Sequence, residues 1–299
     1  MTPFSKPLIA LSLTEPDEGL LRYAAKLARA FDWRDVHFLH VAAPGNPKGE
    51  DLQVIQGRMR AEVERVFGEP PAGCKLAFHA AEGSRLDHIL GEVVDNQRDL
   101  ILLGHRKMRS GRRSLARRAA MVAPCSVWLV PEGAPAEISG ILVPTDFSSH
   151  SADALSVAVK IARATGVAQC QALHVYFDPS TVRFDEHLDE ILGQEEQAFK
   201  EFLASVDTLG VEVEAMFHES THPCQAILRI AERSGTDLIV MNTRGRSQAA
   251  SVLLGSTTSE TITETTVPIL AVKHFGSRMT LLDALVSHRL WDKESPKTN

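Results

Sequence analysis

The sequence predicts an α/β fold made of two copies of a five-stranded parallel-sheet domain in tandem. The chain has 299 residues, enough for two domains of roughly 150 residues each. Short apolar runs alternate with segments of helical periodicity, which is typical of parallel sheets with right-handed crossovers. In addition, several segments of the first half recur in the second half, which indicates an internal duplication.

The duplication is visible in three pairs of segments. They recur at a nearly constant spacing: Leu39-His40-Val41 as Leu173-His174-Val175, Lys26 to Ala30 as Lys160 to Ala164, and Asp99 to Leu102 as Asp237 to Val240. A steady spacing across separate matches is hard to obtain by chance, so each half should carry the same order of strands and helices.

The second copy shows the expected alternation most clearly. Its strands are predicted at 141–143, 169–176, 211–217, 238–242 and 269–272. Its helices are predicted at about 150–165, 186–208, 223–234 and 255–265. Ser148 is a suitable N-cap for the first of these helices. Pro223 near the start of the third helix and Gly235 after its end are typical helix boundaries.

The first copy gives the same order of elements. Its strands are predicted near 7–12, 36–42, 75–80, 99–104 and 126–130. The segment 131–139, rich in Pro, Gly and small residues, is a domain linker. We therefore expect domains at 1–131 and 139–275. The tail 276–299 has apolar residues near helical spacing and should form an amphipathic helix, covering either this chain's own core or a second chain.

The amino-acid composition indicates the class of protein and the compartment that it suits. Of its residues, 44% are hydrophobic and 23% are charged, as in an ordinary globular protein. The net charge of −6 argues against general nucleic-acid binding. Four scattered cysteines without CxxC spacing suit a reduced, cytoplasmic compartment. No apolar run is long enough to span a membrane, and the first apolar run is predicted to be a strand and not a signal peptide.

Polar segments of the second copy follow the predicted strands, where ligands of open α/β sheets bind. Gly245 and Gly255 lack a Cβ, so backbone N–H groups can approach an anion closely. Ser256 and Thr257 begin a helix whose free N–H groups favour a phosphate. Arg244 and Arg246 add positive charge, and Asp146 at the end of another strand can accept hydrogen bonds from a base or ribose.

The spacing Asn242-x2-Gly245-x9-Gly255-Ser256, with an Asp at the end of the first strand, resembles the universal stress protein family. Val267 to Val272 is similar to the last strand of that family, and the resemblance covers both copies, about residues 5–273. It implies a Rossmann-like domain of the adenine nucleotide alpha hydrolase type, often binding ATP and usually dimeric through its last strands. A tandem member would pack its two copies as a pseudo-dimer.

The resemblance also implies a set of nucleotide-binding residues in the second copy. Pro144, Thr145, Asp146 and Val175 would line the adenine and ribose. The phosphates, with Mg²⁺, would lie among Met241, Asn242, Arg244, Gly245, Gly255, Ser256 and Thr257. Asn242 stands where the family has a glycine and adds a side chain, so a vestigial loop without ATP stays the alternative.

The first copy has lost most of these features. Ser12 stands in place of Asp146, Lys107 in place of Gly245, and Arg113-Ser114 in place of Gly255-Ser256. We therefore expect a degenerate site in a domain that acts as a structural partner. Its basic loop, Arg106 to Arg118, is either a solvated face or a site for an anionic partner: a polyphosphate, an acidic protein surface or RNA. RNA is the weakest of these, because the loop has no aromatic side chain for base stacking.

The sequence predicts a binding protein more than an enzyme. His218, His222 and Cys224 have a spacing that could suit a metal, but we interpret them as unrelated polar residues and expect no metal site. We find no Ser-His-Asp or Cys-His arrangement. Nothing in the sequence positions a general base for attack on the γ-phosphate, so the expectation is at most slow ATP hydrolysis. The prediction is a stress-response protein that binds ATP, with a homodimer left open. The alternatives are a nucleotide-free interaction protein and a slow ATPase or nucleotidyl-transfer enzyme.

Overall fold

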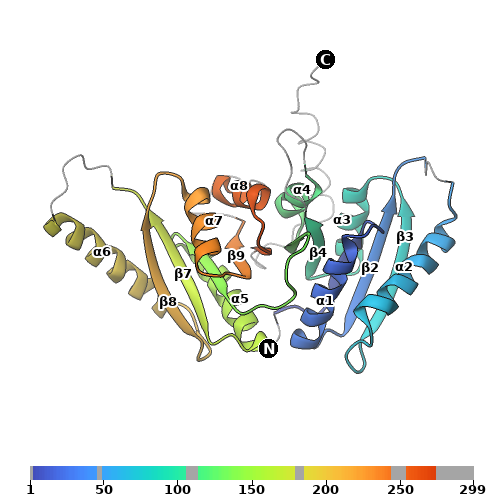
Figure 1. Ribbon diagram of the computed structural model, residues 1–299, viewed down its shortest axis with the longest axis horizontal. Coiled ribbons are helices and arrows are strands. Elements are labelled where there is room, and N and C mark those ends of the chain that lie inside the picture. The colour runs from blue at the N-terminus through green and yellow to red at the C-terminus, as the bar shows by residue number, and fades with distance from the viewer. Residues whose placement is uncertain (1–2, 46–48, 106–113, 179–184, 244–253, 274–299) are drawn as a thin grey trace, which may run out of the picture.

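The structure is a computed structural model that describes residues 3–45, 49–105, 114–178, 185–243 and 254–273 (Figure 1). A ten-stranded sheet runs through the whole molecule in the order β3-β2-β1-β4-β5-β10-β9-β6-β7-β8. The first-half strands are β1 (Pro7–Leu11), β2 (Asp35–Ala42), β3 (Lys75–Glu82), β4 (Leu100–His105) and β5 (Ser126–Pro131). The second-half strands are β6 (Ile141–Thr145), β7 (Gln169–Tyr176), β8 (Glu212–Glu219), β9 (Leu238–Asn242) and β10 (Ile269–Val272).

Helices connect the strands in both halves. In the first half they are α1 (Asp17–Phe31), α2 (Leu52–Phe67), α3 (Arg85–Asp95) and α4 (Leu115–Val122). In the second half they are α5 (Ser149–Thr165), α6 (Asp185–Ala204), α7 (Pro223–Arg233) and α8 (Ser256–Glu264). The predicted boundaries of α5 and α7 are confirmed: the Ser148 side chain accepts a hydrogen bond from the Ser151 amide, and Pro223 lies in the first turn of α7. The predicted strands and their order are confirmed as well.

The two halves join through a single antiparallel pair of strands. Within each half every strand pair is parallel, whereas β10 pairs with β5 in antiparallel register, Leu270 opposite Trp128. The strands of the two halves therefore point in opposite directions. The carboxyl ends of the first-half strands lie on the same side of the sheet as the amino ends of the second-half strands. This is the pseudo-dimer through the last strands that the resemblance implies.

Two hydrophobic cores, one on each face of the sheet, extend through both halves. On one face, buried side chains of α1, α2, α5 and α6 pack against the sheet. On the other face, those of α3, α4, α7 and α8 do so. Each helix turns one apolar stripe to the sheet, as expected for a parallel α/β arrangement. Because both cores contain residues of the two copies, the copies share their packing.

The linker, the cysteines and the helices bear on the expectations from sequence and composition. The linker passes from β5 to β6, and Lys26 of α1 is paired there with Glu137. At the end of the linker, Gly140 packs against the backbone of Gly235. A Cβ at Gly140 would lie 2.9 Å from the Gly235 backbone oxygen, which is too close for a larger residue. All four cysteines are free thiols. Among the described helices, none has the length and apolarity needed to cross a membrane. The predicted tail helix, 276–299, lies outside the described residues.

Replacing Trp128 by Ala should destabilise the whole chain. Trp128 is fully buried at the junction, with Tyr23 and Phe31 at ring-centroid distances of 5.9 and 6.2 Å. Loss of such a side chain reduces the free energy of unfolding by about 3–5 kcal/mol. Urea denaturation measures this change. The control Val54→Ala, at a side chain 64% exposed on α2, should stay within about 0.5 kcal/mol of the wild type. Equal losses in both variants would contradict the prediction.

Candidate functional site

A hollow of about 270 Å³ lies in the second half, at the carboxyl ends of β6, β7 and β9. Nine of the eleven residues predicted for the site line it: Pro144, Thr145, Asp146, Val175, Met241, Asn242, Gly255, Ser256 and Thr257. The other two, Arg244 and Gly245, lie outside the described residues. The parallel order of the strands explains this gathering, since segments far apart in the chain end at one edge of the sheet.

Three residues in the first turn of α8 line this hollow with backbone amides that the helix itself does not bond. Gly255 is the N-cap and has no side chain to cap the helix. The first hydrogen bond of the helix runs from the Ser259 amide to the Gly255 carbonyl, at 2.8 Å. The amides of Ser256, Thr257 and Thr258 precede that bond, so the helix itself does not use them. Together with the positive end of the helix dipole, they form a suitable place for an anion.

The backbone amide of Gly255 itself donates to the Thr243 carbonyl at 2.9 Å. The amides that an anion could use are therefore those of the residues that follow Gly255. A Cβ at Gly255 would meet only ordinary contacts, 3.7 Å from the Thr243 oxygen and 3.8 Å from Thr258 Oγ1. Its φ of −55° is accessible to any residue, so packing within the protein does not require a glycine here.

The side chain of Asn242 leaves the hollow open. Its amide nitrogen donates to the His150 carbonyl in α5, at 2.9 Å. The backbone carbonyl of Asn242 accepts a hydrogen bond from Thr258 Oγ1, also at 2.9 Å. The extra side chain thus connects β9 with α5, the backbone of the same residue bonds to α8, and the cavity persists beside them. The concern that Asn242 would block an anion is not realised among the described residues.

The turn after β6 holds the carboxylate of Asp146 in place. Its Oδ1 accepts hydrogen bonds from the Ser148 amide, the Ser148 hydroxyl and the Ser151 hydroxyl, at 3.1, 2.6 and 2.5 Å. The next residue, Phe147, has a φ of +61°, a region that a bulky side chain rarely adopts. Its ring stacks on His174 at a centroid distance of 4.2 Å. Packing of this ring therefore offsets the backbone strain.

The first half repeats this turn with the two polar residues exchanged. Leu13 takes the place of Phe147 and has a φ of +55°. Ser12, at the end of β1, donates to the carboxylate of Asp17, the first residue of α1, at 3.0 Å. In the second half the carboxylate belongs to the strand end and the hydroxyl to the helix. The predicted loss of the strand-end carboxylate is thus accompanied by a new one on the helix.

A hollow of about 380 Å³ is also present in the first half. Asp17 lines it, and burial raises the pKa of this carboxyl above its ordinary value despite hydrogen bonds from Ser12 and the backbone. Leu39, Leu103 and Val130 contribute apolar walls. Most of the predicted basic loop, 106–113, lies outside the described residues. Among the described basic side chains, Arg117 donates to Ser259 of α8 at 2.6 Å and so connects the two halves.

His40 and His174 share a structural role. Each ring places Nδ1 beside the carbonyl of the last residue of the neighbouring strand, His40 at 3.0 Å from Leu11 and His174 at 2.8 Å from Thr145. The two rings therefore fix the same strand end in each copy, in agreement with the prediction that packing explains them. His218, His222 and Cys224 do not come together as a three-residue metal group among the described residues.

Sequence reasoning missed several side chains of the second hollow. They are Ser151, Leu173, Pro223, Ile227 and Thr258. Leu173 and Ile227 are apolar and could not be distinguished from core residues in the sequence. Ser151 and Thr258 carried a usable signal, because each lies in the first turn of a helix that follows a predicted site segment.

Comparisons with known proteins agree with the duplication. The sequence profile described as the universal stress protein family matches residues 4–131 and again 138–273. Universal stress protein MJ0531 of Methanocaldococcus jannaschii is 31% identical over 139 residues, which cover 44% of this chain and 81% of that protein. A Thermus aquaticus protein, the universal stress protein in the QAH/OAS sulfhydrylase 3′ region, is 32% identical over 134 residues, 44% of this chain and 97% of that protein.

Solved structures share the fold over nearly the whole chain. A universal stress protein from Archaeoglobus fulgidus has a TM-score of 0.63 at 19% identity, with 91% of this chain and 98% of that chain covered. A protein of unknown function from Pseudomonas aeruginosa, PA1789, has a TM-score of 0.67 at 17% identity, with 97% and 98% covered. These structures therefore share the architecture of both copies.

Stability should fall as the pH drops through about 6.5. His105, the last residue of β4, is buried, and burial lowers its pKa because the charged ring would lose hydration. The unfolded chain takes up this proton near pH 6.5, whereas the folded chain does so only at lower pH, so the stabilisation is complete above pH 6.5 and is lost below it.

The variant His105→Gln cannot take up that proton. Its free energy of unfolding should vary less between pH 7.5 and pH 5.5 than that of the wild type, by up to about 1.4 kcal/mol per pH unit. Urea denaturation at the two pH values measures the slopes. Identical slopes for both proteins would show that the His105 ring does not contribute.

Proposed function

We propose a nucleotide-binding function on one premise: the chain belongs to the universal stress protein family. The proposed site is the hollow of the second half, with ATP as its ligand. The first half serves as the structural partner that completes the sheet. In this proposal the protein is a nucleotide-dependent sensor in a stress response, acting in the cytoplasm, where its free thiols stay reduced.

The observation that carries the proposal is the set of amides at the start of α8 that have no hydrogen bond to the described residues. The amides of Ser256, Thr257 and Thr258 precede the first hydrogen bond of the helix. A phosphate placed there would accept charge-assisted hydrogen bonds from them, which are about twice as strong as neutral ones. The hydroxyls of Ser256 and Thr257 also line the hollow and can donate to the same oxygens.

The remainder of the hollow suits the nucleoside. Its apolar lining comes from three sides: Leu173 and Val175 of β7, Ile227 of α7 and Met241 of β9. These side chains offer a slot for a flat aromatic base. Asp146 lies at the rim with its Oδ1 fixed by three donors. A carboxylate held in this way is a suitable acceptor for ribose hydroxyls.

The volume that the described residues enclose is small for a ligand site. At about 270 Å³ it lies just below the usual range of small-molecule sites, about 300–1,000 Å³. We propose that Arg244 and Gly245 complete the phosphate end, as the family resemblance implies. Mg²⁺ would come with the phosphates, because this ion keeps several waters and is usually held through the nucleotide.

We propose binding without efficient turnover. Hydrolysis of the γ-phosphate requires a residue that orients water for attack, and the described lining of the hollow contains Asp146 as its one carboxylate. That carboxylate lies at the end of β6, where its Oδ1 is already engaged by Ser148 and Ser151, and we propose that it contacts the ribose. Slow hydrolysis is compatible with this arrangement.

Calorimetric titration of ATP, ADP and AMP into the full chain tests the proposal. We expect one site per chain and weaker binding as phosphates are removed, because each lost phosphate gives up contacts to α8. Asp146→Asn keeps an acceptor for the Ser148 and Ser151 donors but removes the charge. It should weaken ATP binding by about 10- to 150-fold, the equivalent of a charged hydrogen bond of about 1.5–3 kcal/mol.

The variant Gly255→Ala separates ligand contacts from folding. A Cβ here meets only ordinary contacts within the protein, so the free energy of unfolding should change by less than about 1 kcal/mol. In the complex the same Cβ would crowd the phosphate, so ATP affinity should fall at least 10-fold, by roughly 1.4 kcal/mol or more. The matched control is Gly193→Ala in α6, where a Cβ meets open space.

Other outcomes would overturn the proposal. Two ATP sites per chain would mean that the first half also binds nucleotide. Absence of any nucleotide binding would favour the interaction-protein alternative. In that case an anionic partner at the basic loop should be lost on changing Arg112 and Arg113. Turnover that exceeds that of Gly255→Ala would favour a slow enzyme.

A further inference from the structure

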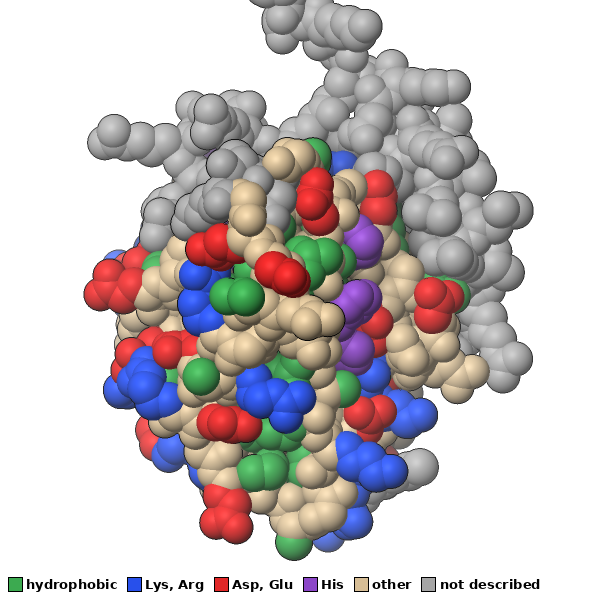
Figure 2. Space-filling model, turned by 90° about the vertical axis from the view of Figure 1, so that its right-hand side faces the viewer, with side chains coloured by type: hydrophobic (Ala, Val, Ile, Leu, Met, Phe, Trp, Pro, Cys, Tyr) green, Lys and Arg blue, Asp and Glu red, His purple; other side chains and the backbone are tan. Residues whose placement is uncertain are grey.

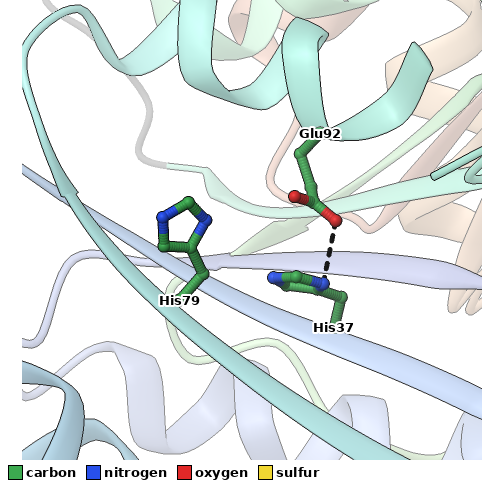
Figure 3. A group of neighbouring side chains, drawn as sticks. All are labelled: His37, His79 and Glu92. Carbon is green, nitrogen blue, oxygen red and sulfur yellow. Dashed lines mark ion pairs between the residues drawn. The ribbon is translucent and has the colours of Figure 1, made fainter. Parts of the chain in front are cut away.

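Three side chains of the first half meet outside both hollows. His37 comes from β2, His79 from β3 and Glu92 from α3 (Figure 3). One ligand-type atom from each residue lies within 4.8 Å of the others. The group is near the amino end of β2, because His37 pairs in register with Leu8 at the start of β1. The hollows, in contrast, lie at carboxyl ends of strands.

The ring of His37 has one nitrogen engaged and one nitrogen open. Its Nδ1 lies 2.8 Å from Glu92 Oε1. Nε2 is buried and has no hydrogen-bond partner among the described residues, although buried nitrogens are normally paired. A neutral ring that donates from Nδ1 to Glu92 carries its lone pair on Nε2. In Figure 3 this nitrogen lies on the side of His79.

Glu92 acts as the orienting partner of His37. Its Oε1 also accepts from the side-chain nitrogen of Asn96, at 2.8 Å. In Figure 3 its other oxygen lies on the side of His79. Metal-ligating histidines almost always donate their second N–H to a carboxylate or carbonyl, which fixes the tautomer and the ring orientation. The contact between His37 Nδ1 and Glu92 Oε1 already has this geometry.

The neighbouring cation does not face the open nitrogen. Arg98 lies 3.0 Å from His37 Nδ1, on the Glu92 side of the ring. Its guanidinium also pairs with Asp35 at 2.9 Å. The carboxylates of Asp35 and Glu92 compensate the charge of Arg98. They therefore reduce the repulsion between Arg98 and a metal ion at Nε2 of His37.

Of the three residues, His79 is the one accessible to solvent. His79 is exposed and lies on β3, the edge strand of the sheet. Figure 2 looks onto this edge of the first half and shows histidine side chains gathered at the surface. Two nitrogen ligands of a tetrahedral zinc ion are about 3.4 Å apart, since each Zn–N bond is about 2.0–2.1 Å. The ligand atoms of the group lie within 4.8 Å of one another, so binding requires the exposed His79 ring to move closer to His37.

We propose that His37 Nε2 and His79 bind a divalent transition-metal ion, with Glu92 as positioning residue and water in the open coordination positions. Imidazole ligands suit Zn²⁺, Cu²⁺ and Ni²⁺. Such an ion would join β2, β3 and α3 and so stabilise the outer part of the first half, independently of nucleotide binding.

Calorimetric titration of Zn²⁺ into the full chain, stripped with a chelator and free of nucleotide, tests this site. The wild type should bind one ion that His79→Ala loses or binds at least 10-fold more weakly. Because His79 is exposed, this variant should fold normally. The matched control is His88→Ala, a histidine of α3 whose Nε2 lies 3.0 Å from the Glu82 carbonyl and which is not part of the group. It should bind Zn²⁺ like the wild type.

Two further measurements separate ligation from a structural effect. Co²⁺ bound at the site should give visible absorption bands typical of a nitrogen-ligated ion, and these should disappear in His37→Gln. Glu92→Gln should weaken Zn²⁺ binding by about 10- to 100-fold, as expected for loss of an orienting partner. Equal Zn²⁺ binding by wild type and His79→Ala, or no binding at millimolar zinc, would overturn the proposal.

Discussion

The antiparallel pairing of β5 with β10 is the interaction on which the rest of the structure depends. It joins two parallel sheets into one and makes the hydrophobic core on each face continuous through both copies. Without it, the last strand of each copy would present an open edge, which natural proteins avoid exposing. The same pairing makes the strands of the two copies run in opposite directions. Since each hollow lies at the carboxyl ends of its own strands, the two hollows lie at opposite ends of the strands.

The two copies share the backbone conformation of the turn after their first strand but differ in its side chains. Leu13 and Phe147 share a positive φ in equivalent turns, and His40 and His174 hold the same strand end in each copy. The polar pair in the turn kept its hydrogen bond while carboxylate and hydroxyl exchanged places. A scaffold can therefore conserve the shape of a site after its ligand chemistry has changed, because the turn is fixed by packing and main-chain geometry.

The group of His37, His79 and Glu92 belongs to a different kind of site. It uses side chains from neighbouring strands and the last part of a helix that covers them, and none of these residues takes part in either hollow. The proposed nucleotide site and the proposed metal site thus lie in different copies. If both proposals hold, one copy would respond to a nucleotide and the other to a metal ion while both share the same hydrophobic cores.

The sequence by itself determined the order of strands and helices and nine of the residues that line the second hollow. Apolar periodicity and the Gly255-Ser256 spacing are local signals, which the chain carries without folding. The tertiary structure decided the rest: that Asn242 bonds to His150 and leaves the cavity open, that the Gly255 amide is occupied, and that His37, His79 and Glu92 meet. These features depend on contacts between residues far apart in the chain, and only the packing of strands and helices brings them together.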